Sequence, residues 1–375
     1  MNSYQIYSEY LFAKADKQGI PLSGTFELTA RCNLDCRMCY IHKRENDRLA
    51  RSCERSAEQW LTLARECRQA GLLHLLLTGG EPLLLPDFKE IYTGCRKLGL
   101  MVSVNTNASL IDAEMVSFFA AEPPARMNIT LYGASAKTYE TLCGDGNAYD
   151  RVVNAILALQ GAGVLVKLNF SATPYNHADA EKVYAFAKEH CLPLQAATYM
   201  FPPARACEKG CFAADRLTPA EAARGQIVYD RSRFAPDVLR ERWEKQLSGI
   251  EVTDPDKECQ EFPTERIRCR AGSSTFWLTY DGYLRPCGMM TKPSANVAEL
   301  GFSEAWKEIR AAREQILVPP QCSACTVRHA CDQCAAVCLA ETGEFTGVPG
   351  YLCEKTHAYL ELIRRELEQG ETAEI

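Results

Sequence analysis

The chain contains 375 residues, with a formal net charge of -6 and 19 cysteines. This acidic balance provides no basic field to attract a phosphate backbone, which excludes nucleic acid as a partner. No run of about eighteen apolar residues occurs, and the N-terminus lacks the basic-then-apolar order of a signal peptide. We therefore expect a cytoplasmic protein without membrane contact, in which so many cysteines indicate metal binding rather than disulfides.

Short and long apolar patterns alternate along the first half of the chain. Short runs rich in Leu, Val and Ile are followed by longer stretches of helical period, which is typical of successive βα units and a parallel sheet. Six such units are too few for a closed eight-unit barrel. The predicted strands span residues 25–29, 72–77, 101–105, 127–131, 164–170 and 194–200, and the predicted helices span 56–69, 87–98, 113–120, 149–159 and 179–190.

At this length we expect two domains, because a single core stops growing near roughly 250 to 300 residues. The predicted fold class is α/β, with a partial (β/α)6 TIM-like barrel and a C-terminal cysteine-rich domain. The segment from Cys269 to Cys353 is poor in periodic secondary structure, so metal ligation should supply much of its stability. The predicted divisions are an N-terminal arm (1–24), the barrel (25–235), a connecting segment (236–268) and the C-terminal domain (269–375), with further helices over 219–230, 237–247 and 354–369.

A compact cysteine array follows the first predicted strand. It reads Cys32-Asn-Leu-Asp-Cys36-Arg-Met-Cys39, and three thiolates at this spacing can hold three irons of a 4Fe-4S cluster while the fourth iron stays open. A structural zinc site is the alternative, but it would need a fourth ligand from elsewhere. Ligand sites in parallel α/β folds gather at the C-terminal ends of strands, which is where this array lies.

A glycine-rich motif ends the second predicted strand. In Thr78-Gly79-Gly80-Glu81-Pro82, the two glycines allow close backbone approach to a small molecule, and the Glu81 carboxylate can accept a hydrogen bond from an amine. The array and this motif together predict a cluster site beside a small-molecule pocket.

These two motifs, in this order and separation, resemble those of the radical S-adenosylmethionine (radical SAM) enzymes, and the resemblance covers nearly the whole chain. It implies that S-adenosylmethionine chelates the open iron and that Gly79, Gly80 and Glu81 hold its amino group. Tyr40 stands where the family places an aromatic near the cluster and adenine, while Cys143 stands where some relatives carry an arginine for the ribose. The implied cosubstrate contacts are Tyr40, Thr78, Gly79, Gly80, Glu81, Asn107 and Thr130.

A second array of eight cysteines lies near the C-terminus. Eight thiolates can ligate two 4Fe-4S clusters, although spacing alone equally permits two zinc sites. The order of these cysteines resembles the SPASM domain of radical SAM enzymes that act on peptides and proteins, which implies three 4Fe-4S clusters in all. By that resemblance the outer cluster takes Cys322, Cys325, Cys331 and Cys353, and the inner cluster takes Cys269, Cys287 and one or both of Cys334 and Cys338, with Cys259 as a further candidate.

The resemblance implies a peptide maturase. An electron from the reduced first cluster, supplied by a donor such as flavodoxin or ferredoxin, would cleave S-adenosylmethionine to a 5'-deoxyadenosyl radical. That radical would remove hydrogen from a ribosomally made precursor peptide and lead to a thioether or carbon-carbon crosslink or a related modification. Only 31 residues precede Cys32, too few for a leader-binding domain, so a separate recognition protein is one expected partner.

Two alternatives remain open. Sulfatase-maturating relatives carry an aspartate after the second cysteine of the C-terminal domain, where this chain has Gly288, and that departure disfavours formylglycine formation. A non-catalytic iron-sulfur protein is the other alternative, and the intact motif from Gly79 to Pro82 argues against it, because a scaffold needs no cosubstrate pocket.

Overall fold

Parallel strands form the centre of the molecule in the computed structural model, which describes residues 3–41, 43–202, 205, 215–249, 267 and 269–372. Each strand pairs in parallel with the next in the order β1-β4-β5-β6-β7-β8. All six predicted strands are confirmed, with ends that differ by a few residues. They are β1 (Ser23–Glu27), β4 (His74–Thr78), β5 (Met101–Thr106), β6 (Arg126–Thr130), β7 (Val166–Ser171) and β8 (Leu194–Ala197).

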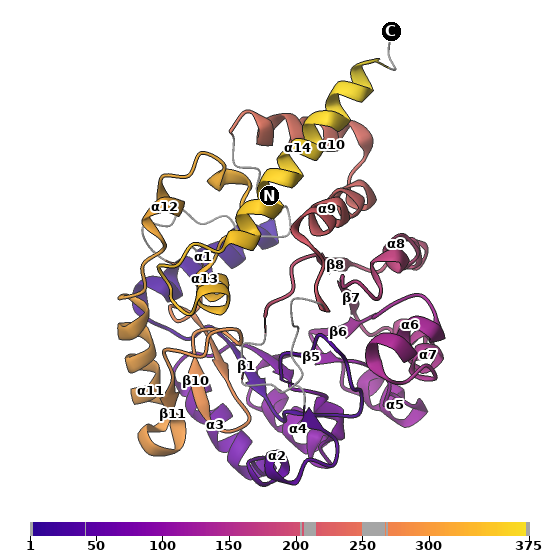
Figure 1. Ribbon diagram of the computed structural model, residues 1–375. Helices are drawn as coiled ribbons and strands as arrows, with labels where there is room; N and C mark the ends of the chain where they lie inside the picture. The colour runs from indigo at the N-terminus through magenta and orange to yellow at the C-terminus, as the bar shows by residue number, and fades with distance from the viewer. Residues whose placement is uncertain are drawn as a thin grey trace.

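Amphipathic helices cover the outer side of these strands (Figure 1). Side-chain caps fix several helix starts: Ser56, Asp112 and Ser135 each accept a hydrogen bond from a backbone N–H in the first turn. The architecture is therefore the expected α/β partial barrel. The helices are α3 (Ala57–Gln69), α4 (Phe88–Lys97), α5 (Ala113–Ala121), α6 (Ala136–Cys143), α7 (Ala148–Gly161) and α8 (Ala180–Glu189), of which only α6 was not predicted.

The C-terminal region extends the same sheet. Strand β9 (Thr275–Leu278) pairs in parallel with the outer edge of β1, and β10 (Tyr283–Arg285) and β11 (Ala295–Asn296) follow antiparallel. Helix α11 (Val297–Arg313) packs on this extension. The prediction that residues 269–353 are poor in periodic structure is therefore wrong for 275–313.

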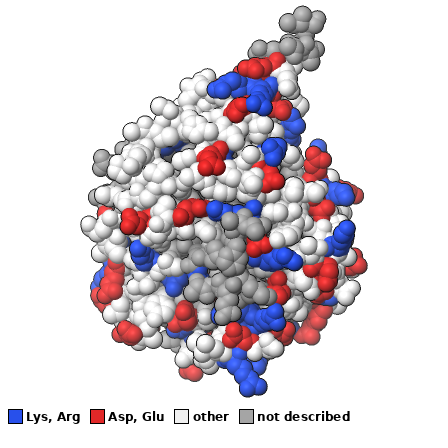
Figure 2. Space-filling view, viewed as in Figure 1, with Lys and Arg blue, Asp and Glu red and all other residues white. Residues whose placement is uncertain are grey.

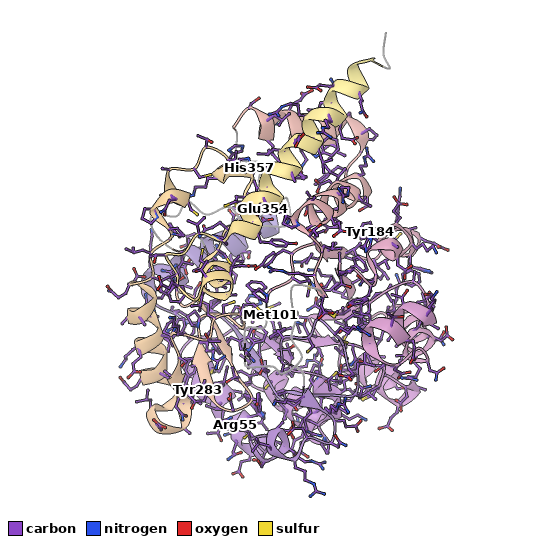
Figure 3. All side chains as sticks on the ribbon, viewed as in Figure 1. Arg55, Met101, Tyr184, Tyr283, Glu354 and His357 are labelled. Carbon is purple, nitrogen blue, oxygen red and sulfur yellow. The ribbon has the colours of Figure 1, made fainter. Side chains whose placement is uncertain are left out.

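The physical reason is apolar burial. Phe276 of β9 contacts Phe26 of β1 and Phe302 of α11, with ring centroids 6.5 and 5.1 Å apart. All three rings belong to the main hydrophobic core, so apolar burial holds this part of the C-terminal region on the barrel. Arg55, which precedes α3, donates a hydrogen bond of 2.8 Å to the carbonyl of Tyr280 in the turn between β9 and β10. Arg55 and the nearby Tyr283 are labelled in Figure 3.

The remaining helices lie outside the regular βα units of the barrel. Helices α9, α10 and α14 enclose a second apolar cluster that includes Ile227, Trp243 and Ile363 (Figure 1). Helix α1 packs against the start of β4 through stacked rings of Phe12 and His74. The bounds are α1 (Ser3–Gln18), α2 (Arg48–Ser52), α9 (Pro219–Arg233), α10 (Pro236–Leu247), α12 (Pro320–Ser323), α13 (Ala335–Thr342) and α14 (Gly350–Thr372), with two short strands β2 (Arg31–Cys32) and β3 (Lys43–Arg44).

Charged side chains are mixed on the face shown in Figure 2, where lysines and arginines alternate with aspartates and glutamates. Across the described part of the chain, no helix combines the length and apolar content needed to cross a membrane.

Candidate active site

The loops that carry the two motifs are joined by backbone hydrogen bonds at the C-terminal ends of β1 and β4. The amide of Gly80 donates to the Thr29 carbonyl and that of Glu81 to the Arg31 carbonyl, both at 2.8 Å. A Cβ on Gly79 would lie 2.5 Å from the Thr29 oxygen, and one on Gly80 would lie 2.4 Å from the Arg31 oxygen. Glycine is thus required for the approach of these two backbone segments, which fixes the motif directly beside Cys32.

The Glu81 carboxylate links the ends of β4 and β5. It is fully buried; Oε1 accepts from the Leu83 amide (3.0 Å) and the Thr106 hydroxyl (2.8 Å), and Oε2 accepts from the Asn107 amide (2.7 Å). Burial raises the pKa of Glu81 and the three hydrogen bonds lower it. Burial has the larger effect, so the pKa rises to about 7. A carboxylate has about four acceptor positions, so Oε2 retains one for a ligand.

The Asn107 side chain faces the first cysteine array. Its Nδ2 donates to Asn33 Oδ1 at 3.0 Å and lies 3.6 Å from the Cys32 Sγ, while its Oδ1 accepts from the Ser109 hydroxyl at 2.6 Å. Asn33 donates in turn to the Ser109 hydroxyl at 2.8 Å. The structure therefore brings together Cys32, Glu81 and Asn107, three of the residues predicted from sequence.

The array loop is held from its other side by the end of α6. The amides of Asp35 and Arg37, which flank Cys36, donate to the carbonyls of Cys143 (2.9 Å) and Leu142 (3.0 Å). The pKa of the Cys36 thiol is raised well above its usual range. The larger cause is its hydrogen bond with the Cys143 thiol, and the second is burial. Sequence reasoning had treated Cys143 only as a missing arginine, but its position one residue before the helix-ending Gly144 places it against the array.

Two further contacts organise the three thiols. The Leu34 amide lies 3.4 Å from the Cys32 Sγ, where it would stabilise a thiolate, although burial raises the pKa of that thiol in the absence of a metal. Tyr132, just beyond β6, is half-buried and interacts electrostatically with Cys32, Cys36 and Cys39, and loss of solvent contact is the main reason that its pKa is raised. Tyr132 was not predicted as a site residue.

The remaining predicted cosubstrate contacts occupy separate positions. Thr78 is buried at the end of β4, where its carbonyl accepts from the Leu28 amide at 2.8 Å. Thr130 ends β6 and pairs with Asn169 of β7. Tyr40 is half-buried close to both Cys39 and Cys287, so it lies between the two cysteine arrays, and loss of solvent contact is the main cause of its raised pKa.

A buried ion pair beside Tyr40 was missed by sequence reasoning. Arg205 makes three contacts of 2.6 to 2.8 Å with the fully buried Glu27 carboxylate, its guanidinium lies 5.6 Å from the Tyr40 ring centre, and its Nε donates to the Gly288 carbonyl at 3.2 Å. Trp277 Nε1 donates to the same carboxylate at 2.9 Å. Burial raises the pKa of Glu27 and outweighs the lowering effect of Arg205.

The second array divides into two groups in space. Cys334 packs with Cys287 on one small apolar cluster and interacts electrostatically with Cys287 and Cys269, and burial raises its pKa to about 12. The amides of Met289 and Val337 each lie 3.4 Å from the Sγ of Cys287 and Cys334, respectively. The other group comprises Cys322, Cys325, Cys331, Cys338 and Cys353, which interact with one another.

No disulfide joins any cysteines in the described part of the chain. Within that part, no three His, Cys, Asp or Glu side chains are close enough to hold a single metal ion. Cys259, a further ligand candidate, lies outside the described residues.

Comparisons with known proteins agree with this geometry. Residues 26–187 match the model of the radical SAM superfamily. An AdoMet-dependent heme synthase of Methanosarcina barkeri is 25% identical over 85% of this chain and 93% of its own. The sporulation killing factor maturation protein SkfB of Bacillus subtilis is 26% identical over 75% of this chain and 63% of its own. The crystal structure of Streptococcus suis SuiB bound to precursor peptide SuiA shares the fold, with a TM-score of 0.67 and 20% identity over 91% of this chain and 78% of its own.

Proposed function

We propose, from the premise that residues 26–187 form a radical SAM domain, that this protein is a peptide-modifying enzyme. It would remove hydrogen from a ribosomally synthesised precursor peptide and so install a thioether or carbon-carbon crosslink, or a related modification. The observation that carries the proposal is the junction of the two motif loops, which sets Cys32, Glu81 and Asn107 side by side. A 4Fe-4S cluster and S-adenosylmethionine, when bound there, supply a 5'-deoxyadenosyl radical.

The residues present fit that pair of groups. Cys32, Cys36 and Cys39 provide three thiols on one loop, which is held by α6 on one side and by the glycine motif on the other. The free acceptor position on Glu81 Oε2 suits an ammonium group. Tyr40 and Tyr132, both half-buried, lie beside these thiols.

The choice of a peptide substrate rests on the relatives. SkfB is named as a maturation protein, and SuiB has been solved with its precursor peptide. The chain covers 63% of SkfB, so that protein's activity is carried over here as a proposal. We further propose a flavodoxin-like or ferredoxin-like electron donor and, for leader binding, a separate recognition protein.

The second array would hold two auxiliary 4Fe-4S clusters. We assign Cys269, Cys287 and Cys334 to the inner cluster, because Cys334 lies with the other two, and Cys322, Cys325, Cys331 and Cys353 to the outer cluster. Cys338 lies with the outer group, where the Gln333 amide nitrogen is 3.2 Å from its Sγ. With three thiols from the described residues, the inner cluster would keep one iron for substrate or for Cys259.

Sulfatase maturation is disfavoured by local packing. A Cβ on Gly288 would lie 2.8 Å from the Trp277 ring, which is itself fixed by its hydrogen bond to Glu27. An aspartate at this position, the presumed base in sulfatase-maturating relatives, would require that ring to move.

Haem synthesis is a second candidate. The alignment with the Methanosarcina heme synthase spans nearly the whole of that protein, which is a greater share than for SkfB. Formation of haem from a tetrapyrrole precursor by the purified enzyme, with precursor peptides left unchanged, would establish this function in place of peptide maturation.

The radical chemistry is tested with the reconstituted enzyme and dithionite. We expect it to cleave S-adenosylmethionine to 5'-deoxyadenosine, and the variant Cys32→Ala/Cys36→Ala/Cys39→Ala to release none, as followed by liquid chromatography. A matched control is Cys53→Ala/Cys191→Ala, two exposed cysteines outside both arrays, which should retain cleavage. Continued cleavage by the triple variant would refute the assignment.

Binding of S-adenosylmethionine should depend on the ionisation of Glu81. Its pKa near 7 in the free protein means that it is mostly protonated at pH 6 and mostly ionised at pH 8. An ammonium group favours the ionised form, so the ratio of wild-type affinity to Glu81→Gln affinity should rise about tenfold from pH 6 to pH 8. Taking the ratio cancels the titration of the ligand itself. Calorimetric titration at several pH values measures it, and a constant ratio would contradict the expected role of Glu81.

A further inference from the structure

Arg285, the last residue of β10, carries buried nitrogen atoms without a hydrogen-bond partner. Its Nε and Nη1 are both inaccessible to solvent and unpaired, while the residue as a whole is half-buried. It lies directly across from Trp277 in the β9–β10 pair, on the side of the sheet that holds the Glu27 carboxylate. Two buried nitrogens of a guanidinium without partners are costly, because nothing in the protein replaces the hydrogen bonds that water would have made with them.

Two described carboxylates act on Arg285, those of Glu27 and Asp281, and both accept hydrogen bonds from other groups. Glu27 Oε1 accepts from Arg205, and Glu27 Oε2 accepts from Arg205 and from Trp277. Asp281 is exposed in the β9–β10 turn, where its Oδ1 accepts from the Thr279 hydroxyl at 2.5 Å. Among the described residues, the Glu27 carboxylate is paired with Arg205, so the positive charge of the neighbouring Arg285 has no buried counter-ion of its own.

Arg285 lies close to residues that adjoin both cysteine arrays. Arg205 contacts the Tyr40 ring, which follows Cys39 of the first array, and the carbonyl of Gly288, which follows Cys287 of the second. Arg285 neighbours Arg205 electrostatically and precedes Cys287 by two residues. A group bound to Arg285 would thus lie between the two arrays, where a substrate must be placed to meet the radical.

We propose that Arg285 binds a carboxylate of the substrate, so that the enzyme selects peptides with an acidic side chain or a terminal carboxylate at the reacting segment. The proposal rests on the proposed function for the identity of the substrate as a peptide. A guanidinium suits this role because its planar N–H groups match the two oxygens of a carboxylate. On binding, the Arg285 side chain turns its unpaired nitrogens toward the ligand.

Small blocked amino acids test the site without knowledge of the natural peptide. The probes are N-acetyl-glutamate N-methylamide, its neutral counterpart N-acetyl-glutamine N-methylamide, and N-acetyl-alanine, which carries only a terminal carboxylate. Their dissociation constants for the reconstituted holoenzyme with S-adenosylmethionine are measured by ligand-observed NMR. We expect at least one carboxylate probe to bind about tenfold more tightly than the glutamine probe. The tighter of the two carboxylate probes identifies the source of the carboxylate.

Variants locate the preference. Arg285→Gln should abolish the preference for the carboxylate probes over the glutamine probe. Arg285→Lys keeps the positive charge but lacks the planar guanidinium, and it should retain part of this preference. The matched control Arg365→Gln, which removes an exposed arginine paired with Glu361 on α14, should leave it intact. Equal binding of charged and neutral probes by the wild type would overturn the proposal. So would an unchanged preference in Arg285→Gln, including one accompanied by an altered reduction potential, which would assign Arg285 to the inner cluster.

The test also separates this inference from the proposed function. Cleavage of S-adenosylmethionine by the wild type is measured on the same preparation. A carboxylate preference that depends on Arg285 in a protein without cleavage would sink the proposed function and leave the anion site standing. Cleavage of S-adenosylmethionine without a preference for carboxylate probes would overturn the anion site and leave the proposed function standing.

Discussion

An Arg205→Ala variant should lose about 3–5 kcal/mol of folding free energy, because the fully buried Glu27 carboxylate would be left without its charged partner. Burial raises the pKa of Glu27 even with Arg205 present. A carboxyl group whose pKa is raised in the folded state destabilises the fold increasingly as pH rises. The loss should therefore be larger at pH 8 than at pH 5, where Glu27 can take up a proton. Urea denaturation of the cluster-free protein at both pH values measures it.

Two controls separate charge from packing. Arg205→Lys keeps a cation near Glu27 and should lose less, and Arg205→Ala/Glu27→Gln removes both charges and should recover much of the stability. Equal unfolding free energies for Arg205→Ala and the wild type would show that the ion pair does not hold the barrel to the segment around Gly288.

Replacing Cys334 with serine should remove one auxiliary cluster, about four irons per chain, whereas replacing Cys338 should leave the iron content near that of the wild type. Cys334 lies with Cys269 and Cys287, which have no other cysteine beside them in the described part of the chain, while Cys338 lies within a group of five. Iron analysis and electron paramagnetic resonance of the reconstituted variants measure the difference.

The two variants are matched controls for each other, since both change one sulfur to oxygen on the same short helix. Retention of all irons by Cys334→Ser, with loss of four irons from Cys338→Ser, would reverse the assignment of these cysteines. Equal losses in both would indicate that each ligates a cluster.

The barrel and its motif loops could be predicted from sequence because their signals are local. Strand-length apolar runs mark β1 and β4 to β8, and each motif follows directly on a strand. The roles of Cys334 and Cys338 could not be predicted, because both follow Cys331 closely in sequence and the resemblance left either or both as ligands. What separates them is a helix: Cys334 caps the N-terminus of α13, whereas Cys338 lies one turn inside it and is buried.

Long-range pairs were the other gap in the sequence analysis. Glu27 and Arg205 are 178 residues apart, and no periodic pattern connects a glutamate at the end of a strand with an arginine in a later loop. The extension by β9 was missed because its apolar side chains were outweighed by the surrounding cysteines. Only the fold shows that Phe276 completes the apolar contacts of Phe26.

The pairing of β1 between β4 and β9 has a consequence for the order in which the protein is made. The first barrel strand leaves the ribosome long before residues 275–278, so during synthesis one of its edges has no neighbour. An uncovered strand edge is a template for pairing with other chains, and partly folded chains aggregate through such edges. The C-terminal region thus covers an edge of β1 as well as carrying the second cysteine array, and nascent chains that stop before it would be the most prone to associate.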